Sequence, residues 1–159
     1  MCYNLIKIKE RSMATISKKI FIKSPVEKVF KFVVAPENWT KYVTSLTDIR
    51  DVSSDKVEEG TTFKWEYRMM GMKFNGKGMV TENVKNKSFG LKMEGHFPIV
   101  EKYGFAKVDE GTELSFEIEY GVPGKLLGSF ANKVVIEKLN KKEAAYVLAR
   151  VKTLCEELS

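Results

Sequence analysis

The chain has 159 residues, of which 43% are hydrophobic and 30% are charged, and this balance is typical of a globular domain with one substantial core. Its net charge of +6 comes from basic residues that are spread along the sequence without a dense run, so we expect no nucleic-acid partner. No apolar run approaches the roughly 18 residues of a membrane-spanning helix, so we expect no integral membrane association.

The N-terminal region gives expectations about domain boundaries and location. Residues 1–13 are predicted to be an extension and residues 14–159 to form one domain, because a clear pattern begins after Met13. Either Met13 is the true start, or the residues before it add a short strand or a tail. The first residues lack the apolar core of a signal peptide, and Cys2 and Cys155 have no metal-binding spacing. These features favour a reduced, cytoplasmic location, with no metal and no cofactor.

The first predicted elements are one strand and two short helices. Residues 15–23 alternate between apolar and polar side chains, as a strand with one buried face does. Ser24 and Pro25 then interrupt the pattern, and we expect Ser24 to cap a helix in a capping box with Glu27. Pro36 starts a second short helical segment.

Several strands separated by turn residues follow. Alternation of apolar and polar residues is clearest in the second predicted strand of this group, where aromatic side chains share one face and charged side chains the other. The turn after that strand lies either at Gly71 or at Asn75-Gly76, which is also a hairpin signal. The predicted strands cover residues 46–53, 61–70, 72–82, 87–95 and 98–108, with one more after the turn at 109–111.

After Pro123-Gly124 the apolar period becomes helical and predicts one helix of about 30 residues, roughly 45 Å long. A sheet with one apolar face must be covered, and this helix is the only predicted element long enough. The fold class is therefore predicted as α+β, with a curved antiparallel sheet of about seven strands wrapped around the C-terminal helix. The expected buried residues of the helix are Leu127, Phe130, Val134, Val147, Leu148 and Val151.

Several segments also resemble a known family. The chain is similar to the START-like, Bet v 1-like (SRPBCC) helix-grip superfamily, in particular its polyketide cyclase/dehydrase-like branch, over about residues 14–158. The resemblance implies the helix-grip fold, but members include lipid carriers, hormone receptors, aromatases and cyclases without a universal catalytic residue, so it does not define an activity. The segments that carry the resemblance are residues 20–30, 36–39, 59–61, 111–114 and 120–128.

The inward phase of the strands predicts the wall of a ligand pocket. Apart from Glu101 and Glu82, this phase carries no charge in the central strands. We expect a cavity of several hundred Å³ between sheet and helix, as is usual for small-molecule sites, although the same large side chains can instead fill the space. The predicted ligand-binding residues are Trp65, Tyr67, Phe74, Met93, Tyr103, Phe105, Phe116 and Tyr120 from the sheet, with Leu127 and Phe130 from the helix.

Two titratable residues are the candidates for catalysis. Glu101 lies on the inward strand phase, where a carboxylate can act as a general base or bind a cationic or hydroxyl group. Its alternative role is a rim carboxylate paired with a helix lysine such as Lys125 or Lys133. His96 falls on the outward phase and is expected at the surface or rim, unless a bulge at Pro98 redirects it.

The function that these patterns favour is binding of a small hydrophobic molecule, such as a lipid, isoprenoid, quinone or polyketide-like compound. The first alternative is a cyclase- or dehydrase-type enzyme acting on a hydrophobic substrate, so enzymatic activity stays open. The second is a protein-interaction domain, either a co-chaperone or a ribosome-associated protein. The sequence defines neither the ligand nor the oligomeric state.

Overall fold

The structure is a computed structural model that describes residues 13–95, 98–121 and 133–157. Within these ranges the chain forms one strand, two short helices, six further strands and one long helix, in the predicted order. The strands are β1 (Met13–Ile22), β2 (Leu46–Arg50), β3 (Thr62–Met69), β4 (Met72–Val84), β5 (Ser88–Gly95), β6 (Ile99–Val108) and β7 (Gly111–Gly121). The helices are α1 (Val26–Val34), α2 (Pro36–Tyr42) and α3 (Lys133–Glu157).

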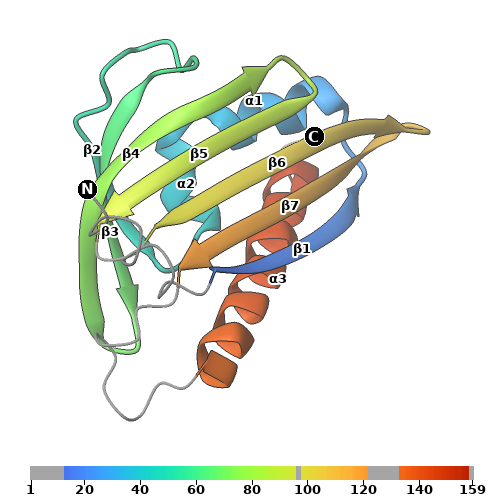
Figure 1. The fold of residues 1–159 in the computed structure, drawn as a ribbon. Helices are drawn as coiled ribbons and strands as arrows, with labels where there is room; N and C mark the ends of the chain where they lie inside the picture. The colour runs from blue at the N-terminus through green and yellow to red at the C-terminus, as the bar shows by residue number, and fades with distance from the viewer. Residues whose placement is uncertain (1–12, 96–97, 122–132, 158–159) are drawn as a thin grey trace, which may run out of the picture.

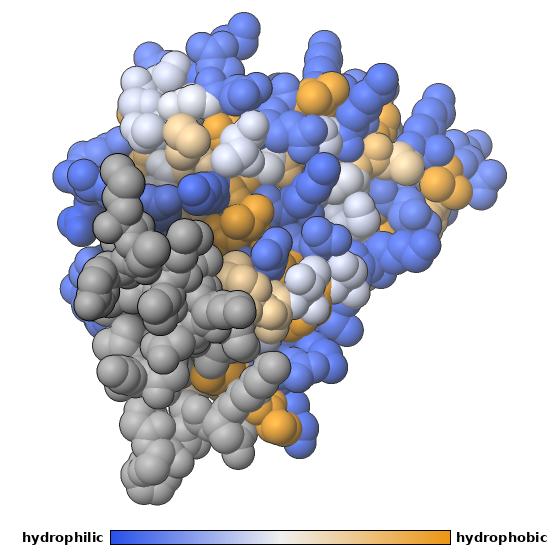
Figure 2. Space-filling view, in the orientation of Figure 1, coloured by the Kyte–Doolittle hydropathy of each residue, from blue (hydrophilic) through white to orange (hydrophobic). Residues whose placement is uncertain are grey.

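The seven strands form one antiparallel sheet in the order β1-β7-β6-β5-β4-β3-β2, so the first two strands of the chain are its edges. All three helices lie on the same side of this sheet, behind it in Figure 1. The other side is the face seen in Figure 2, where hydrophilic residues predominate. The predicted helix-grip architecture is therefore confirmed.

Alternation along β3 shows why the sheet has one apolar face. Phe63 and Trp65 are buried, whereas Lys64 between them is exposed. The strand ends in a tight turn in which Met70 and Gly71 both have positive φ, of 53° and 76°. A two-residue turn of this kind joins antiparallel strands, so the predicted alternative at Gly71 is the correct one.

Two glycines in β4 let aromatic rings from β3 lie flat against the inner face. A Cβ at Gly76 would collide with the Glu94 carbonyl oxygen and the Trp65 indole, and a Cβ at Gly78 would collide with the Phe63 ring. These positions are directly paired with the aromatic residues that cover them. On the inner surface of β3 and β4, the large rings of β3 therefore occupy the space that a side chain would fill at each of these glycines.

The long helix α3 packs mainly against β1 at one edge of the sheet. Val147, Leu148 and Val151 are buried, as predicted. The expectation for Val134 is wrong, because this side chain is 57% exposed. The N-terminal end of α3, where Val134 lies, projects past the ends of β1 and β7, so the sheet has no surface there that could bury this side chain (Figure 1). Leu127 and Phe130 lie outside the described residues.

The start of α1 differs from the predicted capping box. Pro25 occupies the N-cap position, and no described side chain makes a capping hydrogen bond. Ser24 is instead buried, and its carbonyl oxygen accepts a hydrogen bond of 2.8 Å from the Thr112 hydroxyl on β7. The Ser24 hydroxyl is buried without a hydrogen-bond partner among the described residues, so it does not make the predicted capping contact. None of the helices in the described ranges is long and apolar enough to cross a membrane.

Candidate functional site

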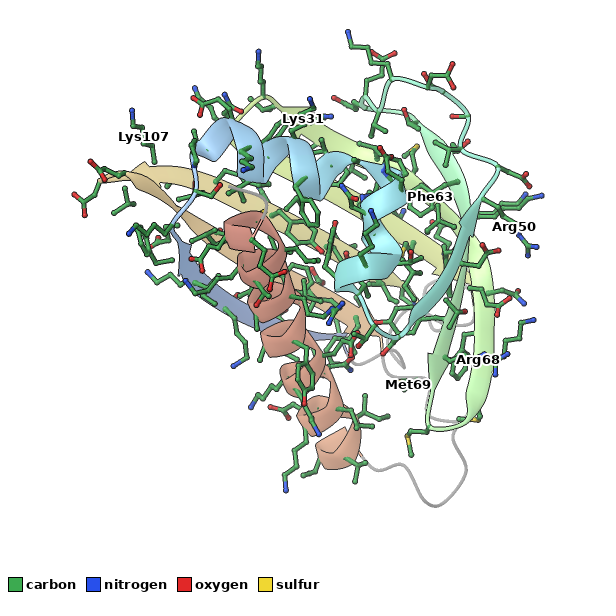
Figure 3. All side chains as sticks on the ribbon, turned by 180° about the vertical axis from the view of Figure 1, so that it is seen from behind. Lys31, Arg50, Phe63, Arg68, Met69 and Lys107 are labelled. Carbon is green, nitrogen blue, oxygen red and sulfur yellow. The ribbon has the colours of Figure 1, made fainter. Side chains whose placement is uncertain are left out.

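The strand residues predicted to line a pocket all lie on the inner face of the sheet, and all are buried. Figure 3 shows the layer of side chains that fills the space between sheet and helices, with Phe63 beneath α2. The buried members of the predicted set are Trp65, Tyr67, Phe74, Met93, Tyr103, Phe105, Phe116 and Tyr120.

These aromatic residues pack mostly against one another and against the short helices. Phe105 meets Phe30 of α1 edge-on, with ring centroids 5.1 Å apart. Tyr103 stacks on Phe116 at 4.7 Å. Large parts of the predicted wall therefore serve as packed core, which is the alternative that the sequence left open.

Part of the set nevertheless borders a small internal cavity. Tyr67, Met93, Tyr103 and Glu101 line it, and its volume is about 20 Å³. That volume holds one water-sized group and is far below the several hundred Å³ that we expected from the sequence. The remaining lining residues come from α2 and the neighbouring strands, and they are Trp39, Tyr42, Val43, Leu46, Ile49, Phe63 and Leu91.

The difference in size has a clear physical origin. Trp39 and Tyr42 of α2 point into the space above the sheet, where Trp39 contacts the Phe63 ring at 4.9 Å. Both residues anchor their polar atoms to one backbone oxygen: the Trp39 indole N–H and the Tyr42 hydroxyl donate to the Val33 carbonyl at 3.0 and 2.8 Å. Sequence reasoning placed them on a helix but had no information about how far they reach toward the sheet.

Glu101 is the chemically distinctive residue of the cavity. Its side chain comes from β6 and is only 5% exposed. Its one hydrogen bond within the described residues is with the Tyr103 hydroxyl, at 3.4 Å from Oε2, and no described Lys or Arg forms an ion pair with it. The prediction that Glu101 faces inward is confirmed, and the alternative of a rim carboxylate finds no support in its burial. The Lys125 and Lys133 side chains lie outside the described residues.

Burial changes the acidity of this carboxyl group. The pKa of Glu101 is raised from 4.5 to about 7, first because burial disfavours the charged form and also because the Glu143 carboxylate lies nearby. The hydrogen bond from Tyr103 acts in the opposite direction. Near neutral pH, Glu101 therefore exists both as a neutral acid and as a carboxylate.

Three tyrosines surround this carboxyl group. Burial raises the pKa of Tyr42, Tyr67 and Tyr103 well above 10.0, and the charge of Glu101 adds to the effect in each case, so all three stay neutral hydroxyls. The Tyr42 hydroxyl donates its proton to the Val33 carbonyl and also interacts with the Tyr103 hydroxyl. The group combines one titratable carboxyl with several neutral hydroxyls in an otherwise apolar space.

Glu143 brings a second carboxylate from α3 to the edge of this region. Its Oε1 accepts a hydrogen bond of 3.2 Å from the Ser45 backbone N–H, so its position is fixed relative to β2. The Tyr67 hydroxyl also interacts with Ser45. Both acidic groups therefore act on the same interior, one inside it and one at its border.

Two further predictions concern charged residues near the pocket. Glu82 was expected on the inward phase, but a register shift between Val80 and Glu82 in β4 turns it to the outer face. There its carboxylate lies 3.6 Å from the Lys102 ammonium. His96 lies outside the described residues, so its predicted place at the surface or rim stays a prediction.

Comparison with known proteins identifies the family. Residues 13–156 match the family model described as polyketide cyclase/dehydrase and lipid transport. The chain belongs to this family. No curated protein matches the sequence.

Solved structures of other proteins share the fold at low sequence identity. The protein TTHA0849 from Thermus thermophilus is 18% identical with a TM-score of 0.77, over 92% of this chain and 99% of that one. A START superfamily protein from Mycobacterium smegmatis is 13% identical with a TM-score of 0.71, over 91% and 99%. The Zhui aromatase/cyclase from Streptomyces sp. R1128 is 7% identical with a TM-score of 0.72, over 91% and 94%.

The described residues around the cavity are mostly apolar. Within residues 13–95, 98–121 and 133–157, no three His, Cys, Asp or Glu side chains are grouped as a metal site would need. The lining of the cavity is aromatic and aliphatic apart from one carboxyl and the tyrosine hydroxyls. Chemically, this arrangement can surround an apolar group and contact one polar group.

Proposed function

We propose that this protein binds a small hydrophobic molecule in the interior between the sheet and the helices, with its polar group at Glu101. The observation that carries the proposal is a carboxyl group, 5% exposed, among aromatic side chains without a cationic partner in the described ranges. The family, which is described by polyketide cyclization and lipid transport, supports the same class of ligand.

The energetic argument starts from the disadvantage of such a group. A buried carboxylate without a counter-charge destabilises the folded state, and an apolar residue of similar size would pack there better. Strongly perturbed carboxyl groups in concave interiors are frequent at functional sites for this reason. We therefore interpret Glu101 as a residue that contacts a ligand rather than as a structural one.

The size of the cavity sets a condition on binding. Ligand sites usually measure about 300–1,000 Å³, whereas the cavity at Glu101 measures about 20 Å³. A ligand larger than a few atoms must displace inner side chains. Met93 borders the cavity, and the partly buried Met69 and Met72 pack against the same core, so flexible thioether side chains are at hand for such a rearrangement.

Titration with N-phenyl-1-naphthylamine, a neutral fluorophore that brightens in apolar surroundings, tests the proposal. We expect saturable binding of one probe molecule per chain. Met93→Trp, which adds volume beside the cavity, should weaken binding by at least about tenfold. Met79→Trp is the matched control, because Met79 is 41% exposed and should leave the affinity unchanged.

Two results would reject binding in this interior. One is the absence of saturable probe binding to the wild-type protein. The other is equal affinity of both tryptophan variants and the wild type, which would place the probe elsewhere. Circular dichroism of the Met93→Trp protein verifies that it is folded, and native mass spectrometry of freshly purified wild type searches for a co-purifying apolar molecule.

Acid/base catalysis on a hydrophobic substrate is the second candidate, and one specific observation favours it. A pKa of about 7 at Glu101 is close to the value that suits a general acid or base at neutral pH. A cyclase- or dehydrase-type reaction requires removal of a proton next to a carbonyl group. In this case the inner carboxylate takes the proton, and the Tyr67 hydroxyl, which borders the same cavity, donates a hydrogen bond to the carbonyl oxygen.

Deuterium exchange separates catalysis from binding alone. The α-protons of 2-tetralone, an apolar ketone, exchange slowly in D₂O, and NMR measures their rate. A catalytic Glu101 predicts acceleration by the wild type that is lost in Glu101→Gln while the ketone still binds. Binding without acceleration in the wild type would leave only the first function.

A further inference from the structure

We propose that the hydrophobic ligand carries a basic amine that pairs with Glu101, and that the interior discriminates against apolar carboxylic acids. This inference rests on the proposed binding function and adds the chemical class of the ligand. It follows from the charges around the cavity, its size and the hydrogen-bonding capacity of its lining.

Among the described residues of the interior, the groups that carry a charge are acidic. Four groups from four elements face or influence the carboxyl of Glu101: Tyr103 of β6, Tyr42 of α2, Tyr67 of β3 and Glu143 of α3. None of them is basic, and the described residues that line the cavity include no Lys, Arg or His.

Two basic residues close to Glu101 in sequence or on the adjoining helix, Lys102 and Arg150, have partners away from the cavity. Lys102 follows Glu101 directly, but it lies on the outer face with Glu82. Arg150 of α3 donates from Nε to the Lys41 carbonyl oxygen at 2.7 Å, in an exposed contact. A cation for Glu101 must therefore come from a bound molecule, as far as the described part of the chain is concerned.

The cavity fits the head group of such a molecule. Its volume of about 20 Å³ accommodates one water-sized group, and a primary ammonium group has about that size. An ammonium group has three donors. The carboxylate of Glu101 accepts one, and the oxygen of Tyr103, which donates its own proton to Glu101, can accept another. The apolar part of the ligand then contacts side chains such as Met93 and Leu91.

A ligand with a carboxylate group is repelled by the same acidic residues. It would lie beside the Glu101 carboxyl with a second negative charge from Glu143 at the border. Like charges in a poorly hydrated site disfavour each other, so an acid binds only while Glu101 keeps its proton. A neutral alcohol pairs with either protonation state and is nearly insensitive to charge.

This difference predicts opposite pH dependences. Because the pKa of Glu101 is about 7, the fraction of carboxylate rises about tenfold between pH 6 and pH 8. Amine affinity should therefore rise about tenfold over this range, and acid affinity should fall. At pH 7, amine binding should release about half a proton, because it drives the remaining neutral Glu101 into the charged form.

A matched set of naphthalene probes tests the inference by isothermal titration calorimetry. The set consists of 1-naphthylmethylamine, 1-naphthalenemethanol and 1-naphthoic acid, which share one ring system. At pH 8 we expect the amine to bind at least about tenfold more tightly than the alcohol, and the acid more weakly than the alcohol. Glu101→Gln should bring the amine within about threefold of the alcohol, and Glu117→Gln, which removes a carboxylate on the outer face, should not.

Each outcome is decisive. An unchanged amine-to-alcohol ratio in Glu101→Gln overturns the inference, as does equal affinity of the wild type for amine and acid at pH 8. If the alcohol binds but the amine gains nothing, ligand binding stands and charge selection falls. If no probe binds, the proposed binding function fails as well. Should Glu101→Gln not fold, an amine affinity of the wild type that is equal at pH 6 and pH 8 overturns the inference.

Discussion

Two parts of the interior are built in different ways. In the part of the interior that contains the buried face of α1, the side chains of Ile22, Val29, Val33 and Leu114 are 0% exposed and entirely apolar. Beneath α2, Glu101 lies among tyrosines and borders the small cavity. The first region has the composition expected of a stabilising core, whereas the second retains a charge that disfavours folding. The difference indicates that stability and ligand recognition are assigned to separate parts of one sheet face.

The apolar core should show the largest loss of stability on truncation. Leu148 of α3 is buried, so Leu148→Ala should lower the free energy of unfolding by about 2–5 kcal/mol. Val134→Ala on the same helix is the control, because this side chain is 57% exposed and its loss should matter by less than about 0.5 kcal/mol. Urea denaturation measures both, and equal losses would contradict the assignment of the buried face.

The polar region should respond to mutation in the opposite direction and depend on pH. The folded protein binds the Glu101 proton more tightly than the unfolded chain does, since the pKa rises from 4.5 to about 7. The contribution of Glu101 to wild-type stability is therefore fully present below pH 4.5 and is lost as the pH rises to about 7, by about 3 kcal/mol in total.

Glu101→Gln removes this titration. The variant should match the wild type near pH 4.5 and exceed its free energy of unfolding by up to about 3 kcal/mol at pH 8. Denaturation curves at the two pH values provide the test. Glu117→Gln is the control, because it removes the same charge from the outer face. A variant less stable than the wild type at pH 8 would identify Glu101 as a structural residue.

Two buried tyrosines provide the smallest and most specific comparison. The Tyr42 hydroxyl donates to the Val33 carbonyl, so Tyr42→Phe should lower stability by about 1 kcal/mol. The Tyr120 hydroxyl is buried without a hydrogen-bond partner among the described residues, so Tyr120→Phe should be neutral or slightly stabilising. A clear loss of stability for Tyr120→Phe in thermal denaturation would show that its hydroxyl has a partner in solution.

The sequence predicted the sheet and its inner face because strand periodicity depends on neighbouring residues. Alternation in β3 and β6 identified Trp65 and Glu101 as inward residues before any tertiary contact was known. Where the pattern was interrupted, prediction failed. The register shift after Val80 turns Glu82 outward, and a bulge leaves no clear signal in the sequence.

Cavity size was the property least accessible from the sequence. It depends on how far Trp39 and Tyr42 of α2 extend toward the sheet, and both are held there by one carbonyl group of α1. Such a contact between two helices is a tertiary feature without a periodic signature. The exposure of Val134 has a similar origin, since it depends on where the sheet ends and not on the helical pattern.

A crystal structure of the protein with 1-naphthylmethylamine tests the central claim most directly. The account predicts the naphthalene ring among Tyr67, Leu91 and Met93, with the ammonium nitrogen about 2.7–3.2 Å from a Glu101 carboxylate oxygen. Inner side chains should have moved to enlarge the cavity beyond about 20 Å³. A saturated crystal in which the amine lies on the outer surface and the side chains around Glu101 keep their present packing would contradict it.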